Sequence, residues 1–183
     1  MLLDLIDLSK LRRAIVYGLV LAGLFILQDL IVSRITLFGV RALLIPAAVT
    51  AIGLFEGGIW GGVIGLVAGY FADMATGHVV LFTILLPAAG FLSGALGKFM
   101  LHKGFMSYMT LALLVLALAA FCQMFRFLFL LDADARVSHS LYLGGSSAWR
   151  VLRTGLIQTL WSLVWAVPIY FPCKLIASRP MGR

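Results

Sequence analysis

The residues of this chain that could do chemistry are a few polar side chains that interrupt long apolar stretches. They are Gln28, Asp29, Glu56, Asp73 and Arg126. A charged side chain at membrane depth is costly, and such residues usually have a partner or a function. A proton relay needs a series of titratable groups, and Asp73 stands alone in its segment. We therefore expect a structural or partner-binding role for Asp73.

No recognisable catalytic set occurs in the sequence. The histidines His78, His102 and His139 stand in neither H-x-x-x-H nor H-E-x-x-H spacing. No serine lies in G-x-S-x-G, and no G-K-[ST] follows the glycines. Cys122 and Cys173 lie in or near apolar segments, which indicates buried side chains and neither a metal site nor a disulfide framework. We expect a protein that is not an enzyme and uses no cofactor or metal.

Small residues recur at every fourth position in the segment around Asp73. The spacing is kept by Gly57, Gly61, Gly65, Gly69, Asp73 and Gly77. An interior glycine costs a helix in water about 1 kcal/mol relative to alanine. In a bilayer, small residues with this spacing let two helices approach closely, and packing drives their association. The stripe therefore predicts contact with another helix, which belongs either to this chain or to a partner.

The composition places most of the chain in a lipid bilayer. Hydrophobic residues make up 63% and charged residues 11% of its 183 residues, against about 45–50% and about 25% in soluble domains. At about 20 apolar residues per crossing, we predict an all-α bundle of six transmembrane helices in one membrane domain, residues 1–183. The predicted helices are Ala14–Val32, Ala42–Phe55, Gly57–Met74, Val79–Gly97, Ser107–Leu131 and Thr154–Ala177. Because the second is short, a re-entrant hairpin over Ala42–Met74 stays an alternative.

Basic residues predict the orientation of the bundle. The net charge of +7 comes from single basic residues at the ends of apolar segments. This placement indicates residues that set the membrane topology and contact anionic lipid, and it does not indicate nucleic-acid binding. With six crossings and a cytoplasmic N-terminus, the larger set lies inside: Lys10, Arg12, Arg13, Lys98, Lys103, Lys174, Arg179 and Arg183. The smaller set lies outside: Arg34, Arg41, Arg136, Arg150 and Arg153. Both termini are therefore expected in the cytoplasm.

The polar residues at the predicted helix ends allow more than one interpretation. Gln28 and Asp29 lie either at the headgroup level, close to Arg34, or against a neighbouring helix or partner. Glu56 precedes the third predicted helix, whose positive N-terminal end would stabilise a carboxylate.

Asp73 lies at the opposite end of the third predicted helix, where the dipole disfavours a carboxylate, so we expect a basic or hydrogen-bonding partner. The simplest basic partner is Arg126, which lies toward the same outer side of the bundle. Each charge would offset the desolvation of the other.

Three stretches, taken in order, resemble the family of the rod shape-determining protein MreD. They are LQDLIVSRITLFGV at Leu27–Val40, GLVAGYFADMATG at Gly65–Gly77, and LRTGLIQTLWSLVWAVPIYFPCKLIASR near the end of the chain. The second is similar to the family's G-x-x-x-G-x-x-x-D-x-x-[ST]-G signature. The chain departs from the family at Arg41-Ala42, where Pro-Asp is common, and at Val79–Phe82, where a further glycine is common.

The resemblance implies a non-catalytic scaffold of the bacterial elongation machinery in the cytoplasmic membrane. Such a protein would bind the single-span protein MreC, and through it connect MreB filaments with the peptidoglycan synthases RodA and penicillin-binding protein 2. Docking would use the first three helices and the loop 34–41. Polar contacts to partners would come from Gln28, Asp29, Arg34 and Arg126.

The family's fold is similar to the S-components of energy-coupling-factor transporters, which implies vitamin binding as the alternative function. An S-component would bind its vitamin in an outward pocket at the outer helix ends. We expect no dense polar cluster there to orient such a ligand, and therefore prefer the scaffold.

Overall fold

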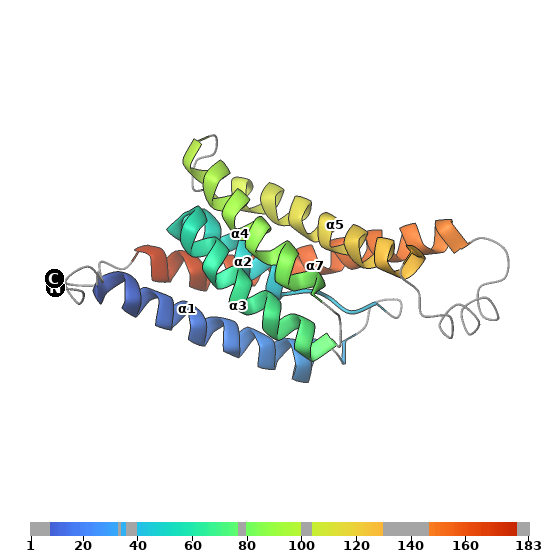
Figure 1. The fold of residues 1–183 in the computed structure, drawn as a ribbon, viewed down its shortest axis with the longest axis horizontal. Helices are drawn as coiled ribbons and strands as arrows, with labels where there is room; N and C mark the ends of the chain where they lie inside the picture. The colour runs from blue at the N-terminus through green and yellow to red at the C-terminus, as the bar shows by residue number, and fades with distance from the viewer. Residues whose placement is uncertain are drawn as a thin grey trace.

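The computed structural model describes residues 8–32, 34–35, 40–76, 80–99, 104–129 and 147–178. These residues form helices and contain no β-strand. The helices are α1 (Leu8–Leu27), continued by the π-helix η1 (Gln28–Val32), then α2 (Ile45–Glu56), α3 (Gly58–Thr76), α4 (Leu81–Phe99), α5 (Phe105–Phe129) and α7 (Ser147–Ser178). Consecutive helices run in opposite directions, so that α1 begins and α7 ends at the same end of the bundle (Figure 1).

Four helices are long and apolar enough to cross a membrane. They contain the stretches Gly58–Ala75, Leu81–Lys98, Phe105–Cys122 and Leu152–Ser178. Ile15–Leu30 and Ile45–Glu56 are apolar but shorter. At about 1.5 Å per residue, α2 is about 18 Å long, against about 30 Å for the hydrocarbon core of a bilayer. The described residues therefore form an all-helical protein, and four of their helices have crossing length.

The short helix α2 lies at the centre of the bundle and contacts α1, α3, α4, α5 and α7. Every residue of α2 from Ile45 to Leu54 is buried, as expected of a helix that is apolar on all sides. Pro46 stands in its first turn, where its missing N–H would have no partner in any case. The surrounding helices thus fold around a short and fully buried core helix.

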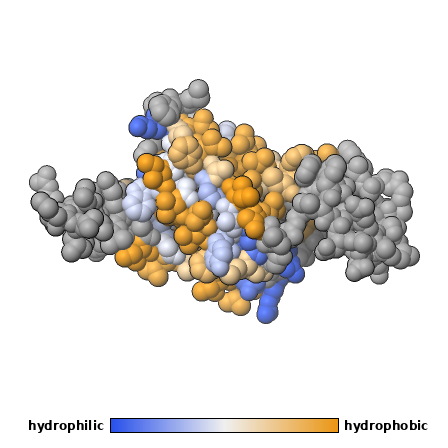
Figure 2. All heavy atoms as spheres, viewed as in Figure 1, coloured by the Kyte–Doolittle hydropathy of each residue, from blue (hydrophilic) through white to orange (hydrophobic). Residues whose placement is uncertain are grey.

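The outer surface of the bundle is apolar in the way that a lipid contact requires. Large side chains on several helices are mostly exposed, among them Ile59, Ile84 and Met106. Figure 2 shows apolar residues across the middle of one face, with strongly hydrophilic residues toward its ends. Monomeric soluble proteins rarely expose continuous apolar patches of this extent, so this surface is suited to lipid.

Some predicted helix boundaries differ from the observed ones. The first helix begins at Leu8 and not at Ala14, so the basic residues before Ala14 extend the helix. The last helix begins at Ser147 and not at Thr154. The second begins at Ile45 and not at Ala42 because Pro46 has no N–H to donate to the carbonyl of Ala42. The N–H groups of Leu43 and Leu44 bond instead to side chains of neighbouring elements.

Candidate functional site

The glycine stripe of α3 packs on α4 of the same chain. A Cβ atom added to Gly61 would lie 2.5 Å from the carbonyl oxygen of Gly90, and one added to Gly65 would lie 2.5 Å from that of Leu86. A Cβ on Gly69 would meet the carbonyl oxygen of Phe82. Each obstacle is helix backbone, so a side chain would force the two helices apart. The prediction of a helix-packing stripe is confirmed for these three glycines, with α4 as the neighbour.

Helix α4 contributes glycines of its own to this contact. A Cβ on Gly90 would meet the carbonyl oxygen of Gly61, and one on Gly94 would meet the backbone of Gly57 and Gly58. The close approach is therefore mutual, as in the small-residue interfaces of membrane helices. It places the end of α3 against the beginning of α4.

Gly57 differs from the other glycines of the stripe. Its backbone lies against Gly94 of α4, but a Cβ added to Gly57 itself would meet nothing within 4 Å. Gly57 links α2 to α3 with a φ of 99°, a conformation that favours glycine. Gly77 lies outside the described residues.

Asp73 has its hydrogen-bond partners at the N-terminus of α4. Its Oδ1 atom accepts a hydrogen bond from the Phe82 N–H at 2.8 Å, and Oδ2 accepts from the Thr83 N–H and the Thr83 hydroxyl, each at 2.7 Å. The side chain is 7% exposed. The first N–H groups of a helix lack partners within it and carry partial positive charge. Asp73 therefore caps α4 from the last turns of α3, and the dipole of α4 favours the carboxylate that the dipole of α3 disfavours.

The predicted pair of Asp73 with Arg126 is not tested by these contacts. Arg126 belongs to α5, but its side chain lies outside the described part of the structure. The three hydrogen bonds from α4 satisfy the Asp73 carboxylate without it.

Glu56 ends α2 and is not the residue that begins α3, which starts at Gly58. Its Oε1 atom accepts a hydrogen bond from the Tyr17 hydroxyl at 3.1 Å. Tyr17 is buried in α1, so this bond joins α1 to the α2–α3 turn. The expected stabilisation of α3 by Glu56 stays a prediction, and the observed contact is to Tyr17.

The segment 40–44 between α1 and α2 is fixed by two side chains from different helices. Oε1 of Gln28 accepts the Leu44 N–H at 3.0 Å, and Oγ of Ser162 in α7 accepts the Leu43 N–H at 2.8 Å. These N–H groups have no carbonyl partner within a helix, and the two side chains supply the acceptors that they need. Gln28 was expected at the headgroup level or against a neighbouring helix or partner; its observed contact is this segment of the chain itself.

A cavity of about 770 Å³ opens where these elements meet. Gln28 and Asp29 line it from η1, Arg41 from the segment 40–44, and Gln158 from α7. The apolar part of the lining comes from the end of α1, the segment 40–44, the beginning of α2, the end of α3 and the beginning of α4. It consists of Phe25, Ile26, Ala42, Leu43, Ile45, Pro46, Ala72, Ala75, Phe82 and Leu86. The expectation that this end of the bundle lacks a dense polar cluster stays a prediction, because four polar residues line the cavity among ten apolar ones. The four come from distant parts of the sequence, and the packing of the helices brings them to one cavity.

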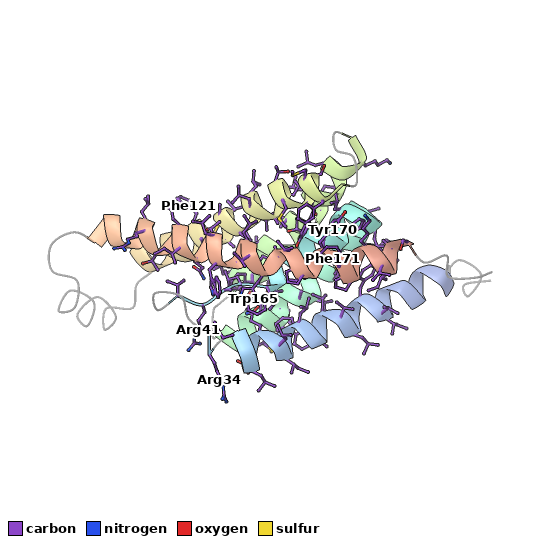
Figure 3. All side chains as sticks on the ribbon, turned by 180° about the vertical axis from the view of Figure 1, so that it is seen from behind. Arg34, Arg41, Phe121, Trp165, Tyr170 and Phe171 are labelled. Carbon is purple, nitrogen blue, oxygen red and sulfur yellow. The ribbon has the colours of Figure 1, made fainter. Side chains whose placement is uncertain are left out.

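Arg34 and Arg41 lie at the same end of the molecule, and their side chains extend outward from it (Figure 3). Both are exposed, but only Arg41 lines the cavity.

Two residues of this region, Gln158 and Ser162, were not selected from the sequence. They stand four residues apart and therefore on one face of α7, and that spacing was the available signal.

Comparison of the chain with protein-family models, curated proteins and solved structures found no match.

Proposed function

We propose that this protein is a non-catalytic scaffold of the bacterial rod-shape machinery, with six membrane crossings and both termini in the cytoplasm. It binds MreC in the cytoplasmic membrane and so links MreB to RodA and penicillin-binding protein 2. One observation supports the proposal. Gly65, Gly69 and Asp73, which carry the most specific part of the MreD resemblance, act together as the unit that fixes α3 to α4. A sequence signature whose residues form one structural unit supports the family resemblance more strongly than the spacing of its residues alone.

The partner helix does not use the glycine stripe, because α4 covers it. The surfaces of α1 and α3 that stay exposed are the docking face, among them Ile15 and Leu19 on α1 and Val63 on α3. The Phe25 and Phe71 rings contact each other edge to face, with centroids 6.4 Å apart, and hold these two helices side by side.

Co-purification from membranes with MreC tests the proposal. Tagged wild-type chain should recover MreC, and Val63→Trp should lower the recovery because the indole disturbs the docking face. Val164→Trp is the matched control, because Val164 is similarly exposed at 59%, against 53% for Val63, but lies on α7. Both variants should keep the wild-type Tm in detergent. Absence of MreC from the wild-type eluate would reject the scaffold, and equal recovery with both variants would reject the docking face.

A vitamin-binding S-component is the second candidate function, and the cavity is the observation that favours it. Its volume of about 770 Å³ falls in the range of about 300–1,000 Å³ that is typical of small-molecule sites. The same eluate distinguishes the candidates. A chain that co-purifies with a transporter ATPase pair, and whose Tm rises with a vitamin, is a carrier and not a scaffold.

A further inference from the structure

The cavity has four polar side chains in its lining. Within the described part of the chain, neither the Arg41 guanidinium nor the Gln158 carboxamide makes a hydrogen bond or ion pair. Gln28 uses its carbonyl oxygen on Leu44, which leaves two amide hydrogens to donate. Asp29 adds a carboxylate that already has an interaction in the structure, and its two oxygens can accept several hydrogen bonds in all. The polar lining therefore offers one cation, one anion and two carboxamides.

The cavity has exposed apolar residues in its lining. Ile26, near the end of α1, lines it and is 59% exposed. Ala75, at the end of α3, is likewise both a lining residue and exposed. A ligand whose headgroup occupies the polar part can therefore extend an apolar chain between these two helix ends into the bilayer. A soluble ligand would leave that apolar opening uncovered.

The backbone at the polar part is irregular in a way that suits a binding site. Gln28 and Asp29 are the first residues of the π-helical turn that ends α1. Such turns are rare and occur frequently at functional sites. Irregular backbone at membrane depth is tolerated where it is buried in protein or lines a cavity.

We propose that this cavity binds a phospholipid with a zwitterionic headgroup, one that carries a phosphodiester and an ammonium group. The phosphodiester accepts hydrogen bonds from the Arg41 guanidinium and from the amides of Gln28 and Gln158. The ammonium group donates to the Asp29 carboxylate. Guanidinium–phosphate and ammonium–carboxylate bonds are charge-assisted, and are about twice as strong as neutral ones. The proposal goes beyond the scaffold function and does not depend on MreC.

Native mass spectrometry of the detergent-purified chain, titrated with defined lipids, tests the proposal. Phosphatidylethanolamine should bind at one site at least several-fold more tightly than phosphatidylglycerol, which has no ammonium group. Arg41→Gln should weaken the binding of phosphatidylethanolamine about tenfold, because it removes the cation. Arg34→Gln is the matched control, because Arg34 is an exposed arginine at the same end that does not line the cavity. It should bind this lipid as the wild type does.

A competition experiment uses glycerophosphoethanolamine, which has the headgroup of phosphatidylethanolamine without its acyl chains. It should compete only weakly, since it lacks the part that covers the apolar opening. Competition as strong as that of the intact lipid would show that the site takes a soluble ligand, and would overturn the proposal. Equal binding of the two phospholipids, or equal weakening by the two arginine substitutions, would also overturn it, because each indicates general lipid adhesion.

Discussion

The hydrogen bonds of Asp73 give the most direct test of how α3 and α4 are held together. In Asp73→Asn, an NH₂ group replaces one carboxylate oxygen and faces N–H or O–H donors. The amide keeps either the bond from Phe82 or those from Thr83, and loses the rest. Hydrogen bonds to a charged group contribute about 1.5–3 kcal/mol each, and a helix cap about 1 kcal/mol. We expect the substitution to lower the free energy of unfolding by about 2–4 kcal/mol.

Thr83→Val supplies the second side of a double-mutant cycle. It removes the hydroxyl that donates to Oδ2 of Asp73 but keeps the backbone N–H and the β-branched shape. Alone it should cost about 1 kcal/mol. In an Asp73→Ala background, which has no acceptor for that hydroxyl, its cost should nearly vanish. The measurement is unfolding of the detergent-solubilised protein, followed by tryptophan fluorescence.

Wild-type stability of Asp73→Asn would refute the capping role. Strictly additive losses in the cycle with Thr83→Val would do the same. A parallel cycle of Asp73→Asn with Arg126→Gln tests the salt bridge predicted from the sequence. If that pair exists, each change lowers stability and the double variant recovers part of the loss; additive losses reject the pair.

Three further outcomes are expected. Gly65→Ala should destabilise the fold by about 1–3 kcal/mol, because its Cβ would lie 2.5 Å from the backbone of α4. Gly62→Ala is the control: its Cβ would have its nearest neighbour 3.7 Å away, and it should be neutral or stabilising in the same unfolding measurement. Equal losses of stability in the two variants would show that the stripe is incidental. In a cysteine-free background, Arg34→Cys and Ser178→Cys should be labelled from opposite sides of the membrane, and labelling from the same side would contradict the topology. Ser162→Ala should cost about 1 kcal/mol because it leaves a backbone N–H of the segment 40–44 without its acceptor, and an unchanged unfolding midpoint would show that this bond does not fix the segment.

Much of the fold can be predicted from properties that each short segment carries by itself. Apolar length and the absence of charge predict a helical membrane protein, since a bilayer leaves few other ways to satisfy the backbone. The spacing of Gly61, Gly65 and Gly69 predicts a face for close helix contact, because residues four apart share one side of a helix. The positions of these helices are accordingly close to the observed ones.

The first residue of α2 is harder to predict from the sequence. The apolar run from Ala42 suggests a longer helix than the observed Ile45–Glu56. Its beginning follows from Pro46, which cannot donate a hydrogen bond to an earlier turn, and the segment before it is positioned by Gln28 and Ser162, which accept hydrogen bonds from its N–H groups. Ser162 lies 119 residues away from Leu43, and no local pattern in the sequence connects the two.

The sequence by itself determined the class of the protein and one packing face, because hydrophobicity and helical periodicity are local. Only the tertiary structure decided that α4 fills this face, that Asp73 caps the helix that follows, and that Arg41 and Gln158 line one cavity. The physical reason is that a carboxylate or a guanidinium at membrane depth has several possible partners of similar energy. Which of them it contacts depends on which helix ends are brought together, and that is a property of the packed bundle.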